Sequence, residues 1–93
     1  MVRDKIALNI EEKRSQRFQF LYALYNLTDG KENYYKDTVE VGKICRFNRD
    51  LTFNIVAYLK GEGLVDYLDF GNQVAITHPG VIHIVYKCKY KFL

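Results

Sequence analysis

Basic and amide side chains in the middle of this chain are of types that bind nucleic acid. They are Arg46, Arg49, Asn54 and Lys60. Arg and Asn can hydrogen-bond bidentately to guanine and adenine, and Lys and Arg attract phosphate. All four are therefore candidates for contact with DNA. The charge around them is balanced, because residues 37–63 hold four Lys/Arg and four Asp/Glu, and this counts against strong phosphate binding.

A second candidate set lies near the C-terminal end of the chain. Lys87, Lys89 and Lys91 alternate there with Tyr86 and Tyr90. Cations beside aromatic rings suit phosphates and bases, so the three lysines are further candidates for DNA contact. The alternative is that these lysines only keep the segment soluble.

Aromatic side chains support a different function, binding to another protein. Phe53, Phe70, Tyr86 and Tyr90 are the candidate anchors for such a partner. Phe70 lies in the turn 69–72, Asp-Phe-Gly-Asn, which has no Lys or Arg to enter a minor groove. We expect Phe70 either to fold onto the domain or to face a partner.

Residue types that support catalysis or metal binding are few and scattered. His78 and His83 have no Asp, Glu or Cys at ligand spacing, and we expect His78 to cap or pack. Cys45 likewise lacks a partner residue that would make it reactive. Arg46 beside it would lower the pKa of the thiol, but without a partner base a buried structural thiol is favoured. We therefore predict no enzyme, no catalytic residue, no metal, no cofactor and no small-molecule substrate.

Length and composition fit one globular domain spanning residues 1–93, with a core over about residues 10–85 and a basic Tyr/Lys tail over residues 86–93. The chain is 48% hydrophobic and 27% charged, with a net charge of +3. It has no apolar run long enough to span a bilayer and no signal-peptide pattern. Its two cysteines form no disulfide framework, so a reduced, cytoplasmic chain is expected.

The pattern of apolar residues predicts a first helix over about residues 10–27, ended by the Thr-Asp-Gly of residues 28–30. A helix that is apolar on two sides is expected to be central in the domain. Lys13, Arg14 and Arg17 near its start are expected to form a solvated face. The two apolar stripes are Phe18, Leu21, Tyr22 and Tyr25, and Phe20, Leu24 and Leu27.

A short second helix is predicted over about residues 38–46. Asp37 and Glu40 have the spacing of a capping box. In this motif, the side chain of each residue accepts a hydrogen bond from the backbone N–H of the other. Phe47 is expected to fill the following turn. The residues expected to be buried are Val39, Ile44 and, as a third candidate, Val41.

A third helix is predicted over about residues 49–61, with Asn48 as its N-cap and Gly61 at its end. Its buried side should face Leu21 and Leu24 of the first helix. The buried residues should be Ile55, Val56 and Leu59, with Leu51 or Thr52 one turn earlier. The outward residues should be Arg49, Asp50, Phe53, Asn54, Ala57 and Lys60.

Two alternating segments, 64–68 and 73–77, predict a β-hairpin across the turn 69–72. The segment 81–93 is ambiguous, because its apolar residues fit both the strand period and a helical stripe. Thr77 as a cap and Pro79 in the first turn favour a helix.

Four segments, LYALYNLTDG, EVGK, YLKGEGLV and ITHPGVIHI, resemble an uncharacterised winged-helix module found in bacterial and archaeal proteins. That module is related in outline to the DNA-binding domains of MarR-type regulators. The resemblance covers roughly residues 18–85 and implies a winged helix presumed to bind DNA, with no catalytic residues. The family usually continues as an acidic helix, whereas this chain continues as YKCKYK over residues 86–91.

The predicted fold class is α+β: a winged helix-turn-helix with a three-helix core, a two-stranded hairpin wing and a C-terminal helix. The predicted function is that of a transcription-regulator module binding duplex DNA through the third helix and phosphate contacts. The alternative is a protein–protein interaction or dimerisation module that does not bind DNA. A homodimer formed through residues 81–93 is expected in either case, because one terminal segment cannot bury so much apolar surface on a small domain.

Overall fold

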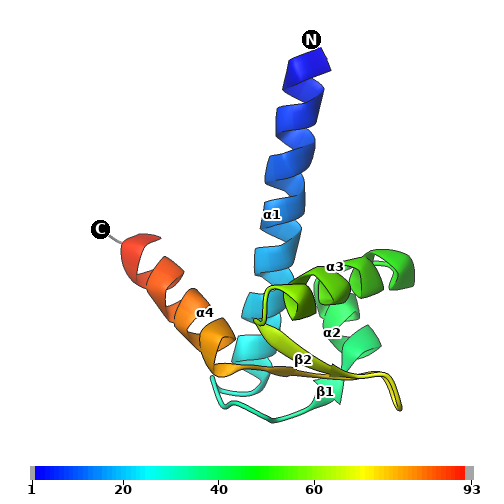
Figure 1. The fold of residues 1–93 in the computed structure, drawn as a ribbon, viewed down its shortest axis with the longest axis vertical. Coiled ribbons are helices and arrows are strands. Elements are labelled where there is room, and N and C mark those ends of the chain that lie inside the picture. Colours follow the sequence, from blue (N-terminus) through cyan, green and yellow to red (C-terminus); the bar gives the residue numbers. More distant parts are fainter. Residues whose placement is uncertain (1, 92–93) are drawn as a thin grey trace.

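The computed structural model describes the backbone of residues 2–91 and the side chains of residues 9–88. Within residues 2–91 the chain forms four helices and a three-stranded antiparallel sheet, so the fold is mixed α+β (Figure 1). The elements in chain order are α1 (Val2–Leu27), β1 (Lys36–Asp37), α2 (Thr38–Ile44), α3 (Arg49–Gly61), β2 (Val65–Leu68), β3 (Gln73–Ile76) and α4 (His78–Lys91).

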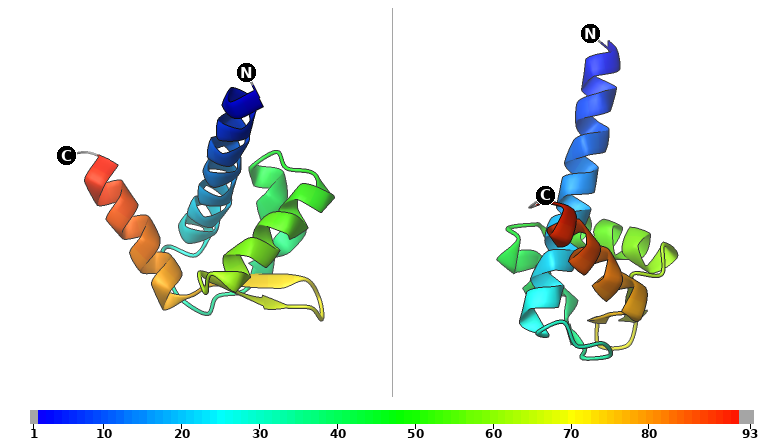
Figure 2. Two further views of the ribbon diagram at one scale, coloured as in Figure 1. Left: turned by 45° about the horizontal axis from the view of Figure 1, so that its top comes forward. Right: turned by 90° about the vertical axis from the view of Figure 1, so that its left-hand side faces the viewer.

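Helix α1 is central, as predicted, because it contacts α2, α3, α4 and β3. It begins well before residue 10, and its N-terminal half projects beyond the rest of the domain (Figures 1 and 2). Only one face is fully buried, through Phe20, Leu21 and Leu24. Tyr22 and Leu27, which the two stripes place in the core, are exposed.

Helix α2 begins at the predicted cap, and half of the capping box is present. The Asp37 carboxylate accepts hydrogen bonds from the backbone N–H groups of Val39 (2.9 Å) and Glu40 (3.4 Å). The Glu40 carboxylate lies 3.7 Å from the Lys43 ammonium group instead of returning to the cap. The helix ends at Ile44, two residues earlier than predicted.

The predicted burial of Ile44 is wrong, since 57% of this residue is exposed. The buried face of α2 is formed by Thr38, Val41 and Gly42. Ile44 lies two residues after Gly42, which is a rotation of about 200° around an α-helix. Its side chain therefore points away from the core, while Val41 is fully buried.

Helix α3 has the predicted bounds and the predicted cap. The Asn48 side chain accepts a hydrogen bond from the backbone N–H of Leu51 at 2.8 Å. Thr52, Ile55, Val56 and Leu59 are buried, in agreement with the predicted register. Thr52 lies directly against Gly42 of α2, and a Cβ atom on Gly42 would overlap its Oγ1 atom. The two helices therefore pack closely at this point.

The sheet contains the predicted hairpin and one further strand. Strands β2 and β3 pair antiparallel, with Val65 opposite Ile76 and Leu68 opposite Gln73. Both Gly71 (φ 86°) and Asn72 (φ 51°) adopt the left-handed conformation that closes the turn. The two-residue strand β1, which the sequence did not predict, pairs with the other edge of β3 and gives the strand order β1-β3-β2.

Residues 78–91 form a helix, so the strand alternative for the C-terminal segment is wrong. Thr77 caps the helix, because its Oγ1 accepts a hydrogen bond from the Gly80 N–H at 3.1 Å. Ile84 is 1% exposed, and Val81 and Cys88 pack beside it against the core. Residues 86–91 thus continue α4 and are not a separate tail.

Helices α1 and α4 diverge from each other toward the C-terminal end of α4 (Figures 1 and 2). The outward face of α4 carries Ile82, Val85 and Tyr86, all of which are exposed. None of the helices within residues 2–91 combines the length and the apolar character that a membrane span requires.

Candidate nucleic-acid interface

The outward face of α3 carries the side chains that the sequence assigned to DNA contact. Arg49, Asn54 and Lys60 are exposed, as are Asp50 and Ala57 on the same face. They share one face because the buried stripe of α3 fixes the rotation of the helix. Two cations and one anion on this face leave it only weakly basic.

Aromatic rings lie near the two cations of this face. The Arg49 guanidinium lies 5.4 Å from the ring centroid of Phe53, and the Lys60 ammonium lies 6.0 Å from that of Tyr67. The rings of Phe53 and Tyr67 meet edge to face at 6.3 Å. Because Tyr67 belongs to β2, this contact joins the outward face of α3 to the hairpin. Phe53 is consequently half-buried and offers only part of its ring to a partner.

The tip of the hairpin presents an aromatic side chain rather than a cation. Phe70 is 96% exposed, so it does not fold onto the domain. Behind it, the Tyr67 hydroxyl donates a hydrogen bond to Asn72 Oδ1 at 2.7 Å, which ties the turn to β2. Asp69 lies beside Phe70 and is also exposed.

Two further candidate cations, Arg46 and Lys87, do not lie on this face of α3. Arg46 is exposed in the turn between α2 and α3, where its backbone has a φ of 63°. Lys87 belongs to α4 and lines a different part of the surface, together with Arg14 and Arg17. The side chains of Lys89, Tyr90 and Lys91 lie outside the described residues.

The basic group of α1 is not simply a solvated face. Arg17 is half-buried, and its guanidinium lies 3.3 Å from the ring centroid of Tyr58 on α3. Lys13 lines a groove on the same side of α1 together with Asn54. The sequence contains no local signal for these contacts, because α1 and α3 meet only through the tertiary fold.

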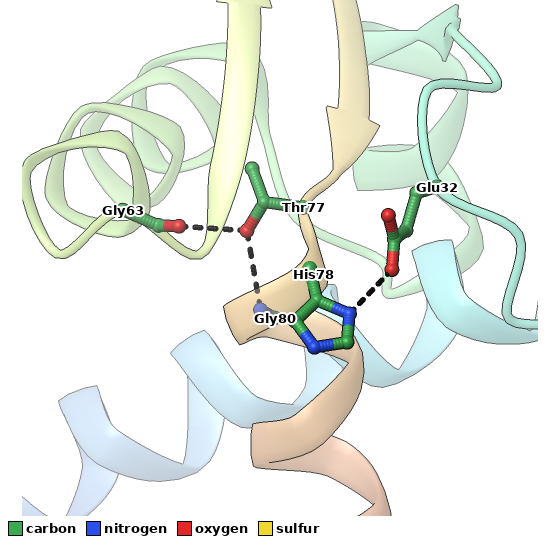
Figure 3. A network of polar contacts seen from close by, with 5 residues as sticks. All are labelled: Glu32, Gly63, Thr77, His78 and Gly80. Carbon is green, nitrogen blue, oxygen red and sulfur yellow. Dashed lines mark hydrogen bonds and ion pairs between the residues drawn. The ribbon is translucent and has the colours of Figure 1, made fainter.

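His78 has a carboxylate partner that its sequence neighbourhood does not reveal. Its Nδ1 atom lies 2.7 Å from Glu32 Oε1, between the start of α4 and the loop after α1 (Figure 3). The adjacent Thr77 hydroxyl donates to the Gly63 carbonyl at 2.6 Å and accepts from the N–H of Gly80. The corner is therefore held by polar contacts with two other segments of the chain, in addition to the cap of α4.

Cys45 does not have the environment of a reactive thiol. Burial raises the pKa of its thiol, and its Sγ lies 3.6 Å from the Gln19 carbonyl oxygen, to which it donates. The lowered pKa considered for a neighbour of Arg46 is therefore wrong, and a structural role fits better. Among the residues whose side chains are described, no three His, Cys, Asp or Glu side chains gather as metal ligands would.

The chain matches no protein-family model, and comparisons with curated proteins and with solved structures find no match either. The geometry of the chain itself is what supports a function.

Proposed function

We propose that this chain is a winged helix-turn-helix module that binds duplex DNA through α3. The order of the elements supports this proposal: α2 and α3 are joined by the four residues 45–48, and a β-hairpin follows α3 directly. Two helices joined by a turn of three or four residues are typical of helix-turn-helix motifs. The close contact of Gly42 with Thr52 fixes α2 against α3.

The observation that carries the proposal is the exposed polar face of α3. A recognition helix enters the major groove with such a face, and its Arg and Asn side chains reach base edges. Here Arg49 and Asn54 are exposed on one face, and Lys60 lies toward the other end of the helix. Arg49 lies near the ring of Phe53, and Lys60 lies near the ring of Tyr67.

The charge of this surface sets an upper limit on its affinity. Asp50 on α3 and Asp66 and Asp69 on the hairpin are exposed and would repel phosphate. Arg46, Arg49 and Lys60 are the cations nearest to the proposed contact. Binding with so few phosphate contacts should be modest and should weaken as salt rises.

Replacing both Arg49 and Lys60 with Ala is expected to weaken duplex binding by at least about tenfold at low salt. A plot of the logarithm of the binding constant against the logarithm of the salt concentration should become less steep. The magnitude of its slope should decrease by about two, because two phosphate contacts are lost. Fluorescence anisotropy with a random-sequence duplex, at several salt concentrations, measures both quantities.

The matched control replaces Lys31 and Lys36 with Ala, which changes the net charge equally but away from α3. Its binding should stay close to that of the unchanged chain. An equal loss in both double variants would show that only net charge matters. Absence of binding by the unchanged chain at low salt would rule out the DNA proposal.

A second candidate function, self-association, is favoured by the outward face of α4. Ile82, Val85 and Tyr86 lie at helical spacing and are exposed on one side of this helix. A two-fold symmetric dimer is the commonest way to cover such a face. Removing the segment after Thr77 does not test this, because it also removes the buried Ile84.

Ile82→Glu is expected to shift the chain from dimer to monomer at micromolar concentration, because it places a charge in the proposed interface. Sedimentation velocity over a concentration series measures the change. Ile44→Glu is the matched control, since Ile44 is an equally accessible isoleucine on α2. A full-length chain that stays monomeric at high concentration would exclude self-association through α4.

A further inference from the structure

A cleft of about 360 Å³ lies between α1, the C-terminal end of α3 and α4. Helices α1 and α4, which both line it, diverge from each other (Figure 2, left). The volume falls within the range of small-molecule sites. None of the candidate DNA-binding residues of α3 lines this cleft.

The inner wall of the cleft is apolar. Phe18 and Leu21 contribute to it from α1, Leu59 from α3, and Leu64 from the segment after α3. Leu21 and Leu59 belong to the core, whereas Phe18 is only half-buried and keeps part of its ring accessible. This wall suits the hydrocarbon part of a ligand.

Three cations surround this apolar wall: Arg14 and Arg17 from α1 and Lys87 from α4. Among the described residues, none of the three has a carboxylate within the 4.0 Å of an ion pair. Glu62 is the one acidic residue that lines the cleft. The three cations outnumber this one acid, so the charge of the cleft lining is net positive.

Two of these cations lie over aromatic rings, Arg17 much more closely than Lys87. The Arg17 guanidinium lies 3.3 Å from the centroid of the Tyr58 ring, and the Lys87 ammonium lies 5.7 Å from that of Phe18. A guanidinium stacked on a ring keeps its in-plane N–H groups available for an anion. Arg17 is thus held in place without its donors being consumed.

His83 also lines the cleft, and the charge of Lys87 affects the pKa of its imidazole. Burial lowers the pKa of its imidazole, and the neighbouring Lys87 ammonium lowers it further. An anion bound near Lys87 would favour the protonated ring.

We propose that this cleft binds a small amphipathic anion, with its apolar body against Phe18 and its anionic group between Arg17 and Lys87. A bare inorganic anion would leave the apolar wall uncovered, and a neutral apolar molecule would leave the cations unpaired. The class is therefore an apolar body bearing a carboxylate, sulfonate or phosphate group. The proposal does not depend on the proposed DNA contact through α3.

A matched pair of fluorescent probes tests the proposal. 8-Anilinonaphthalene-1-sulfonate carries the anionic group, and N-phenyl-1-naphthylamine has the same aromatic skeleton without it. We expect the sulfonate to bind about tenfold more tightly than the neutral probe. Arg17→Met should remove most of this difference, because it keeps an unbranched apolar stem but removes the charge and the N–H donors.

Two control variants separate the cleft from other surfaces. Arg46→Met removes a cation outside the cleft and should leave the binding of both probes unchanged. Ile82→Glu alters the apolar face of α4 and should also leave the sulfonate affinity unchanged. Circular dichroism shows whether each variant is folded. Equal affinity for the two probes, or a folded Arg17→Met variant with undiminished sulfonate binding, would overturn the proposal.

The pH dependence of binding gives a second readout. The charged groups that line the cleft together with His83 are Arg14, Arg17, Lys87 and the carboxylate of Glu62. The sulfonate stays ionised, so its affinity should rise several-fold as His83 gains a proton on lowering the pH. His83→Gln should flatten this rise. A profile that is the same in both chains would show that His83 does not face the bound anion.

Discussion

Leu59→Ala is expected to lower the free energy of unfolding by roughly 2–5 kcal/mol. Leu59 is 2% exposed and belongs to the same core cluster as Leu21 and Leu24 of α1. Truncation to Ala removes buried apolar surface and leaves a cavity, because the helices around it are fixed by other contacts. Urea denaturation followed by circular dichroism gives the change in free energy.

Ile44→Ala is the matched control for this prediction. It removes a similar aliphatic side chain, but from an exposed position on α2, and should change stability by less than about 0.5 kcal/mol. A loss at Leu59 as small as this would mean that the rotation of α3 is wrong. A large loss at Ile44 would show instead that a partner covers this side chain.

Helix α3 was predictable because all of its signals are local. Asn48 caps its start, a 3.6-residue apolar period sets its rotation, and Gly61 marks its end. The same period placed Arg49 and Lys60 on the outward face. The part of the candidate interface that belongs to one helix could therefore be read from the sequence.

Elements that depend on non-local contacts were predicted less well. Strand β1 has two residues, and its pairing with β3 joins segments more than thirty residues apart. The C-terminal segment carried both strand and helix periods. Thr77 caps the helix that forms. Val81, which belongs to the helical stripe but not to the strand pattern, packs against the core beside Ile84, which belongs to both.

The cleft is the clearest case of a feature beyond sequence reasoning. Arg17, Tyr58 and Lys87 come from three helices and are brought together only by the packing of α1, α3 and α4. The pair of His78 and Glu32 likewise spans 46 positions of the chain. No spacing rule relates such residues, because tertiary contacts at this separation leave no period in the sequence.

Gly80→Ala is expected to lower the free energy of unfolding by roughly 1–3 kcal/mol, through steric overlap. A Cβ atom at this position would overlap the carbonyl oxygen of Leu64 and lie 2.7 Å from Ile76 Cγ1. The carbonyl cannot turn away freely, because it accepts a hydrogen bond from the N–H of Thr77 at 3.2 Å. Thermal and urea denaturation of the variant measure the loss.

Gly61→Ala separates this overlap from the general effect of Ala on a helix. Gly61 ends α3, and a Cβ atom there would meet no other atom within 4 Å. Since Ala favours helix over Gly by up to about 1 kcal/mol, this variant should be neutral or stabilised. Gly80 also lies in a helix, so the two substitutions share this gain and differ only in the overlap. If both substitutions stabilise the chain, α4 does not approach Leu64. If Gly61→Ala stabilises the chain and Gly80→Ala destabilises it, Gly80 allows α4 to pack directly on the segment that leads into β2.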